Sequence, residues 1–309
     1  MAEQIKPDYV DRDWTALIKD REAKWDFMWE NYKKEGQKPI PLWQTGAPYI
    51  QHKEGFVPQI LIHPIQKEKR GIIIVCAGGA FRFKSSNEAK PVAEFFHNAG
   101  LNAVVLDYSV DHDFELSSRK SFDVWRAAQE DALRTIRYLR FNASNLGIQP
   151  EKIAIGGFSA GGTVASLAAT GYDYGNPDAE DPIDRVSSRP NAVLPIYSAR
   201  TSDSILGSAD RRRYDFATQK ILTDLSTDIN LKKDSPPFFL AQTAWDDPRP
   251  MLRLGINLAN RGINFEIHIF EDGPHGAGLY DGKDPDSPYY KHTSHWAELA
   301  YEWLIDKGF

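Results

Sequence analysis

The hydrophobic residues follow a helical spacing near the N-terminus and a different pattern afterwards. Between Trp14 and Tyr32, apolar residues recur every three or four positions, which places them on one face of a helix. From residue 59 onward, short apolar runs alternate with longer helical segments. The run at residues 71–76 is unbroken and rich in isoleucine, as in a strand that is buried on both faces.

This alternation defines the class of fold. We expect strands at residues 59–65, 71–76, 102–108, 152–157, 191–197, 237–244 and 265–270, and helices at residues 87–98, 122–142, 159–170, 249–260 and 292–306. Strands that alternate with helices build a mostly parallel sheet with helices on both faces. The sequence therefore predicts an α/β fold.

Composition narrows the functions of the chain. Its 309 residues are 41% hydrophobic and 26% charged, as in an ordinary globular protein, and its single cysteine, Cys76, excludes an internal disulfide. The net charge of −6 and the lack of a long lysine–arginine block argue against nucleic acid as a partner. No apolar run reaches the ~18–20 residues of a membrane helix, and residues 1–10 lack the pattern of a signal peptide. We therefore expect a cytoplasmic protein without a membrane partner.

The most informative motif lies between a predicted strand and a predicted helix. Gly157, Ser159 and Gly161 form a G-x-S-x-G pattern at that junction, which is the context of a nucleophile elbow. The two glycines remove side chains that would clash in so tight a turn, and the serine hydroxyl projects beyond the carboxyl end of the strand. Ser159 is therefore the predicted nucleophile, and the helix that follows offers a free backbone N–H at Ala160.

A serine hydroxyl needs a base and an orienting acid to act as a nucleophile. Asp246 and Asp247 follow the predicted strand at residues 237–244, and His275 follows the last predicted strand. The carboxyl ends of parallel strands meet at one edge of a sheet, so these groups are expected close to Ser159. Asp246 comes first after its strand and is the favoured acid, with Asp247 as the rival. The other histidines show no spacing typical of metal ligands, and we expect neither a metal nor a cofactor.

These motifs resemble the α/β-hydrolase superfamily and, within it, the acetylxylan-esterase-like branch of carbohydrate acetyl esterases. The matching segments are AGGAF at residues 77–81, GFSAGG at residues 157–162 and EIHIFEDGPHG at residues 266–276. The similarity extends over roughly residues 70–304. It implies an α/β-hydrolase fold and hydrolysis of carboxyl esters without a cofactor.

The resemblance also assigns roles to individual residues. It implies Ser159 as nucleophile, Asp246 as acid and His275 as base. It implies an oxyanion hole built from backbone N–H groups, those of Gly79, Ala80 and Ala160.

The sequence departs from the family pattern at four positions near these motifs. Ala80 replaces a glycine and Phe81 a tyrosine, and both changes narrow the expected acyl pocket. Thr163 replaces a frequent histidine, and Arg249 stands where a small aliphatic residue is usual. Phe81 is one expected substrate contact, and Trp245 is the other, because an indole beside the acid can stack on a sugar ring.

The rest of the chain is assigned around this site. We expect residues 1–50 to form an N-terminal helical extension and residues 51–309 the catalytic α/β-hydrolase domain, with residues 199–235 as a small cap insertion before the acid strand. The N-terminal helix packs on the main body, contacts a second copy in a homo-oligomer, or faces the substrate as a lid. These alternatives stay open.

The sequence thus predicts a serine carboxylesterase for short-chain esters, acetyl above all, on carbohydrates such as xylo-oligosaccharides. The expected partner is a small-molecule or oligosaccharide ester. Two alternatives remain: an arylformamidase or other small amide or ester hydrolase with the same triad, and a non-catalytic binding protein on the same fold.

Overall fold

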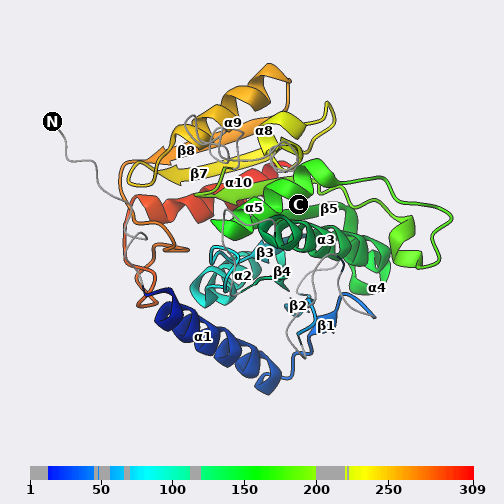
Figure 1. The fold of residues 1–309 in the computed structure, drawn as a ribbon, viewed down its shortest axis with the longest axis horizontal. Coiled ribbons are helices and arrows are strands. Elements are labelled where there is room, and N and C mark those ends of the chain that lie inside the picture. Colours follow the sequence, from blue (N-terminus) through cyan, green and yellow to red (C-terminus); the bar gives the residue numbers. More distant parts are fainter. Residues whose placement is uncertain are drawn as a thin grey trace.

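The protein is built on an eight-stranded sheet with the strand order β1-β2-β4-β3-β5-β6-β7-β8 (Figure 1). The computed structural model describes residues 13–44, 48, 56–65, 70–111, 120–199, 220 and 223–309, with the backbone alone at residues 120–122. The strands are β1 (Ile40–Pro41), β2 (Gln59–Ile62), β3 (Arg70–Cys76), β4 (Asn102–Asp107), β5 (Ile148–Phe158), β6 (Ala192–Ile196), β7 (Phe238–Thr243) and β8 (Phe265–Phe270). Strand β2 pairs antiparallel with both β1 and β4, and all further pairs, from β4 to β8, are parallel. This arrangement confirms the predicted α/β fold.

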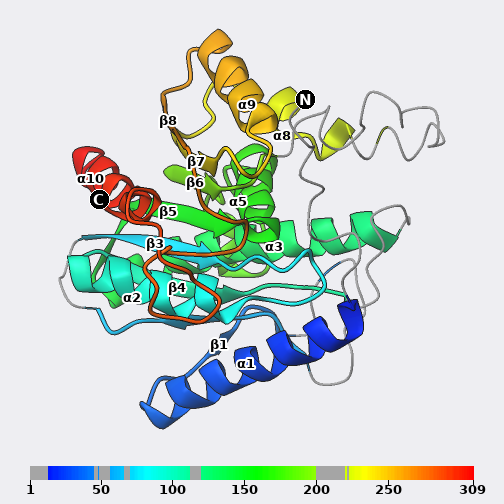
Figure 2. The same cartoon turned by 90° about the vertical axis from the view of Figure 1, so that its left-hand side faces the viewer.

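Helices cover both faces of this sheet. They are α1 (Trp14–Lys34), α2 (Lys90–Ala99), α3 (Lys120–Phe141), α4 (Ala143–Leu146), α5 (Ala160–Gly171), α8 (Thr227–Asn230), α9 (Arg249–Asn260) and α10 (Trp296–Asp306). Helices α3, α5 and α9 contribute to one hydrophobic core, and α1, α2 and α10 contribute to the other, on the opposite face (Figure 2). The sheet is therefore the middle layer of three.

The isoleucine-rich run of β3 shows why the sequence lacks strand alternation there. Ile72 and Ile74 belong to the core beneath α3 and α5, whereas Ile73 and Val75 belong to the core beneath α2 and α10. Both sets of side chains are excluded from water, so neither face of the strand selects polar residues.

The N-terminal helix α1 is part of this body. The Asp13 carboxylate caps its first turn, and Trp25, Trp29 and Tyr32 are buried on its inner face. The Trp25 indole N–H donates to Asp107 Oδ1 at the end of β4 over 3.2 Å. The helix therefore completes one of the two cores, as the first of the three alternatives supposed.

The two proposed boundaries of the chain fall largely on residues that are not described. The junction at residues 50 and 51 lies outside the described residues, although β1, within the predicted extension, already pairs with β2. Of the expected cap insertion, residues 200–219, 221 and 222 also lie outside them. The domain division stays a prediction.

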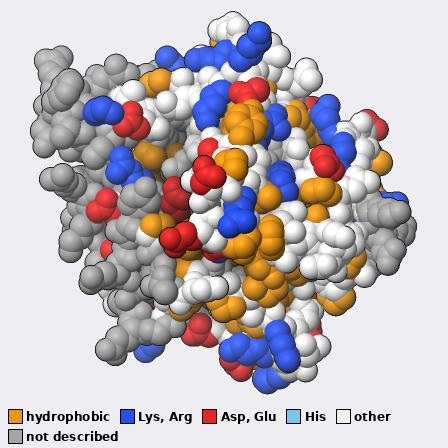
Figure 3. All heavy atoms as spheres, turned by 90° about the vertical axis from the view of Figure 1, so that its right-hand side faces the viewer, with side chains coloured by type: hydrophobic (Ala, Val, Ile, Leu, Met, Phe, Trp, Pro, Cys, Tyr) orange, Lys and Arg blue, Asp and Glu red, His pale blue; other side chains and the backbone are white. Residues whose placement is uncertain are grey.

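One face of the molecule carries charges of both signs. On the face drawn in Figure 3, lysine and arginine side chains are interspersed with acidic and hydrophobic ones and form no continuous basic tract. Among the described residues, no helix combines the length and apolar character that a membrane span needs.

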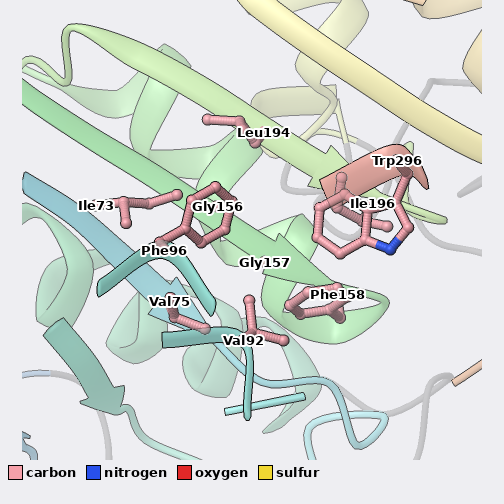
Figure 4. A pocket seen from close by; sticks show the side chains of 10 residues that line it. All are labelled: Ile73, Val75, Val92, Phe96, Gly156, Gly157, Phe158, Leu194, Ile196 and Trp296. Atoms are coloured by element: carbon pink, nitrogen blue, oxygen red, sulfur yellow. The ribbon is translucent and has the colours of Figure 1, made fainter. Parts of the chain in front are cut away.

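A small apolar cavity lies under the strand that carries the serine motif. The side chains of Ile73, Val75, Leu194 and Trp296 line it together with Gly156 of β5 (Figure 4). In the register of the sheet, Gly156 lies between Val75 and Leu194. The missing side chain of Gly156 thus leaves a gap in an otherwise continuous apolar row.

Candidate active site

The serine turn between β5 and α5 forces Ser159 into an unusual backbone conformation. Its φ is +49° and its ψ is −116°, a region that is sparsely populated by residues other than glycine. The flanking glycines leave room for the turn. A Cβ at Gly157 would lie 2.3 Å from the Gly161 oxygen, and a Cβ at Gly161 would lie 2.1 Å from the Cys76 oxygen. Neither glycine position therefore has room for a side chain, because backbone atoms occupy the space that its Cβ would take.

The structure brings Ser159, His275 and Asp246 together in one chain of hydrogen bonds. The Ser159 hydroxyl donates to His275 Nε2 over 2.8 Å, and His275 Nδ1–H donates to Asp246 Oδ2 over 2.5 Å. The serine follows β5, the aspartate follows β7 and the histidine follows β8, all at the carboxyl edge of the sheet. This geometry allows a proton to pass from the hydroxyl to the imidazole.

The rival acid, Asp247, is engaged elsewhere. Its carboxylate accepts hydrogen bonds from the Arg249 backbone N–H and guanidinium at 2.7–3.1 Å. The bonds from Arg249 hold the pKa of Asp247 below its usual range. The unusual arginine of the sequence thus pairs with Asp247, and Asp246 alone of the two aspartates reaches His275.

A loop with a left-handed backbone follows β3 beside the serine. Gly79 has φ +140°, Ala80 has φ +54° and Phe81 has φ +60°. The Gly78 N–H donates to Glu88 Oε2 over 2.7 Å and is therefore occupied. In the described part of the chain, the N–H groups of Gly79 and Ala80, like that of Ala160, donate to no protein acceptor. These are the three N–H groups that the resemblance assigned to the oxyanion hole.

The two expected substrate contacts differ in exposure. Trp245 is 56% exposed and its indole meets the Tyr290 ring edge-on, with centroids 5.6 Å apart. Phe81 is 1% exposed, and its ring packs near Tyr108 and Trp125 in the core. Phe81 thus supports the loop from below, whereas Trp245 presents its indole to solvent. Neither contact with a substrate is tested, and both stay predictions.

The loop that carries His275 is fixed on several sides. The hydroxyl groups of Thr243 and Tyr280 donate to the carbonyls of Gly273 and Pro274 over 2.8 and 2.9 Å. Beyond the histidine, the Trp296 indole N–H donates to the Gly278 carbonyl over 3.1 Å. Hydrogen bonds therefore hold the loop backbone on both sides of His275.

Sequence reasoning missed two polar residues behind the site. Tyr197, directly after β6, lies with its ring centroid 4.9 Å from that of His275. Glu88 is 1% exposed and accepts a hydrogen bond from the Tyr197 hydroxyl over 2.5 Å. Tyr197 shares the strand-end position that identified the acid and the base. Glu88 lies in a short 3-10 turn, Ser86–Glu88, whose sequence carries no motif.

The expectation of a metal-free site was based on histidine spacing. Within the residues that the structure describes, no group of three or more His, Cys, Asp or Glu side chains is arranged to hold a metal ion. His268, on β8, bonds to Glu266 Oε1 over 2.7 Å and stacks near Phe239 and Phe270. It has a local partner and lies apart from the hydrogen-bond chain of Ser159.

The sheet topology and the serine elbow at its carboxyl edge define an α/β-hydrolase. The chain belongs to the BD-FAE family, whose profile matches residues 59–251, more than half of its length. These findings confirm the superfamily and the carbohydrate-esterase branch that the motifs resembled.

Two curated relatives and one solved structure are similar to the chain over most of its length. The chain is 30% identical over 280 residues to endo-1,4-beta-xylanase B of Butyrivibrio fibrisolvens, covering 84% of this chain and 42% of that protein. It is 22% identical over 238 residues to an acetylxylan esterase of Xylanibacter ruminicola, covering 73% and 45%. The crystal structure of an acetyl ester-xyloside bifunctional hydrolase from Caldicellulosiruptor lactoaceticus aligns with a TM-score of 0.74 at 28% identity, covering 88% and 97%.

The chain spans less than half the length of the curated relatives that it matches. The solved structure, in contrast, corresponds to it almost end to end. The fold and the family are therefore shared over most of the described chain.

Proposed function

We propose that this chain is a serine carboxylesterase that removes short acyl groups, acetyl above all, from carbohydrates such as xylo-oligosaccharides. The observation that carries the proposal is the hydrogen-bond chain from Ser159 through His275 to Asp246, with distances of 2.8 and 2.5 Å. These are bonding distances for general-base activation of a hydroxyl.

The reaction proceeds through an acyl-enzyme. Ser159 Oγ attacks the ester carbonyl carbon as its proton passes to His275 Nε2, and Asp246 stabilises the imidazolium. The negative oxygen of the tetrahedral intermediate accepts hydrogen bonds from the N–H groups of Ala80 and Ala160, with Gly79 beside them. Each such donor is worth about 3–4 kcal/mol in the transition state. The C–O bond to the alcohol then breaks, His275 returns the proton to the leaving oxygen, and water releases the acid by the same steps.

The substrate class is supported by two kinds of observation, the similar proteins and the exposed Trp245. The solved structure that aligns almost end to end is an acetyl ester-xyloside hydrolase, and one curated relative is an acetylxylan esterase. Trp245 presents an indole to solvent directly beside Asp246, where a pyranose ring of the leaving alcohol can stack.

The proposal is tested with a panel of esters. The wild-type protein is expected to hydrolyse p-nitrophenyl acetate faster than the butyrate and the octanoate, and to release acetate from acetylated xylo-oligosaccharides. Ser159→Ala removes the nucleophile and is expected to lower kcat by at least ~10³-fold. The matched control is Ser166→Ala, the same change in α5, at a buried hydroxyl that has no hydrogen-bond partner in the described structure.

Each outcome separates the alternatives. Equal background rates for the wild type and Ser159→Ala would identify a binding protein without turnover. Faster cleavage of N-formyl aromatic amides than of any ester would instead support the arylformamidase alternative. Loss of activity in both serine variants would mean that a change of fold, and not the nucleophile, is being measured.

A further inference from the structure

A buried carboxylate lies directly behind the oxyanion loop. Glu88 is 1% exposed and both of its oxygens are used: Oε2 accepts from the Gly78 N–H over 2.7 Å, and Oε1 accepts from the Tyr197 hydroxyl over 2.5 Å. A carboxylate at such a depth is costly unless donors compensate it. The reaction as derived above makes no use of this group.

The same carboxylate is linked to the loop of the base. The Tyr197 hydroxyl, which donates to Glu88, accepts a hydrogen bond from the Gly278 N–H over 3.0 Å. Gly278 lies three residues beyond His275, and the Tyr197 ring lies against the imidazole with centroids 4.9 Å apart. Glu88 therefore connects three segments: the oxyanion loop after β3, the end of β6, and the loop after β8.

The backbone around these groups is shaped to allow the link. Tyr197 has φ +36°, an uncommon value for a side chain of this size. A Cβ at Gly78 would lie 2.6 Å from Glu88 Oε2, so only glycine admits the carboxylate at that distance. Strain at Tyr197 and the requirement for glycine at Gly78 indicate that the link is a feature of the site and not of the core alone.

We propose that Glu88 is a positioning residue for ester hydrolysis: acting through Gly78 and Tyr197, its carboxylate fixes the oxyanion loop and the His275 loop relative to each other. This inference rests on the proposed function. Glu88 touches no reacting atom. Its effect is on where the N–H groups of Gly79 and Ala80 lie relative to the Ser159 hydroxyl, and displacements of about 1 Å can cost ~10²-fold in rate.

The hydrogen bonds fit an ionised Glu88 best. Tyr197 has one hydroxyl hydrogen and already accepts from Gly278, so it serves Glu88 as a donor. A protonated Glu88 would have to donate to Tyr197 and would leave the tyrosine hydrogen without an acceptor. Burial raises the pKa of Glu88 overall, and the bond from Tyr197 and the charge of His275 offset that rise only in part, so the case for the ionised form is based on the hydrogen-bond geometry.

A negative Glu88 also acts on the base through space. Among the described residues, the titratable groups that interact with its charge include Tyr197, His275, Arg21, Tyr108 and Tyr280. The three tyrosines have their pKa raised well above the usual range, chiefly by burial, and stay neutral. An anion near the imidazole favours its protonated form. Removal of that charge therefore moves the acidic limb of the kcat/KM profile to lower pH.

The test compares Glu88→Gln, Tyr197→Phe and the double variant on p-nitrophenyl acetate. The glutamine amide keeps the shape but offers only one acceptor, so one of the two bonds is lost. For both single variants we expect kcat to fall about 10- to 100-fold with KM changed less than about threefold. The double variant should be little worse than the poorer single variant, because both changes break one network. The acidic limb should shift to lower pH in Glu88→Gln and not in Tyr197→Phe.

The control is Glu94→Gln in α2, which removes a carboxylate that pairs with Lys90 on the surface and should keep kcat within about twofold. Wild-type kcat and pH profile in Glu88→Gln would overturn the inference, as would fully additive losses. If Glu88→Gln fails to fold, Tyr197→Phe decides, and a wild-type kcat in that folded variant overturns the inference. Absence of ester turnover in the wild type would refute the proposed function instead.

Discussion

The gap at Gly156 allows a stabilising substitution to be designed. A Cβ at Gly156 would lie 3.4 Å from Leu194 Cβ and 3.5 Å from Ile73 Cδ1, ordinary van der Waals distances. Its backbone is regular strand, paired with β3 and β6. Gly156→Ala therefore places a methyl group in the small cavity of Figure 4 without moving its lining.

The expected gain has two sources. Burial of one methyl group contributes about 0.8 kcal/mol. Restriction of the unfolded chain by alanine in place of glycine contributes about 0.4–1 kcal/mol. Together they predict an increase of about 1–2 kcal/mol in the free energy of unfolding, which for a chain of 309 residues corresponds to a rise in Tm of about 2 °C.

The neighbouring glycine supplies the matched control. A Cβ at Gly157 would lie 2.3 Å from the Gly161 oxygen and 2.4 Å from the Gly161 carbonyl carbon, and both are backbone atoms. Gly157→Ala must therefore open the serine turn, and we expect a loss of about 2 kcal/mol or more together with most of the activity. Gly156→Ala should keep kcat within about twofold, because its methyl group points away from the turn.

The measurement is equilibrium unfolding in urea, supported by calorimetry. The reasoning is refuted if Gly156→Ala lowers the free energy of unfolding, or if the two alanine variants change it equally. Either result would mean that the cavity lining is already in contact across the gap.

Two further predictions concern the N-terminal helix and the groups beneath it. Burial lowers the pKa of His63, whose Nε2 lies 3.0 Å from the Tyr32 hydroxyl, to about 4. Below pH 6.5 the unfolded chain therefore binds a proton that the folded protein does not, and this histidine should cost about 2 kcal/mol of stability between pH 7 and pH 5. His63→Phe should show a correspondingly smaller acid-induced loss in urea unfolding, and an unchanged loss would contradict the cause. Trp25→Ala should lower the free energy of unfolding by about 3–5 kcal/mol, because the indole is 6% exposed and bonded to Asp107. The control Phe27→Ala, at 64% exposure on the same helix, should lower it by less than about 1 kcal/mol. Equally small losses in the two variants would show that α1 contributes little to the core.

Much of the site was predictable because its side chains follow the ends of regular strands. Ser159 comes directly after one apolar run, and Asp246 and His275 come within a few residues of the ends of two others. Parallel pairing brings the ends of those runs to one edge. The sequence favours Asp246 over Asp247 only by its order after the strand, whereas the structure shows Asp247 bound to Arg249 and Asp246 bonded to His275. Local sequence cannot report which neighbour a carboxylate turns toward.

Other features depend on contacts that leave no periodic trace. Glu88 lies in a short 3-10 turn before α2, and its partners are a backbone N–H and a tyrosine more than one hundred residues away. The short strand β1 has two residues, too few for alternation to be read. The packing of α1 was predicted among three alternatives, and the bond from Trp25 to Asp107 is what joins the helix to the sheet. Long-range partners of this kind are set by the assembled fold.

The sheet distributes the three groups unevenly. Ser159 follows a central strand with neighbours on both sides, whereas Asp246 and His275 follow β7 and β8, the last two strands in the described order. Separation of β7 and β8 from the rest of the sheet would move Asp246 and His275 away from the Ser159 hydroxyl while the other strands stay paired. Heat or denaturant would then abolish catalysis before the far-ultraviolet circular dichroism changes. Loss of activity would report the separation of β7 and β8, whereas circular dichroism would report the unfolding of the remaining strands and helices.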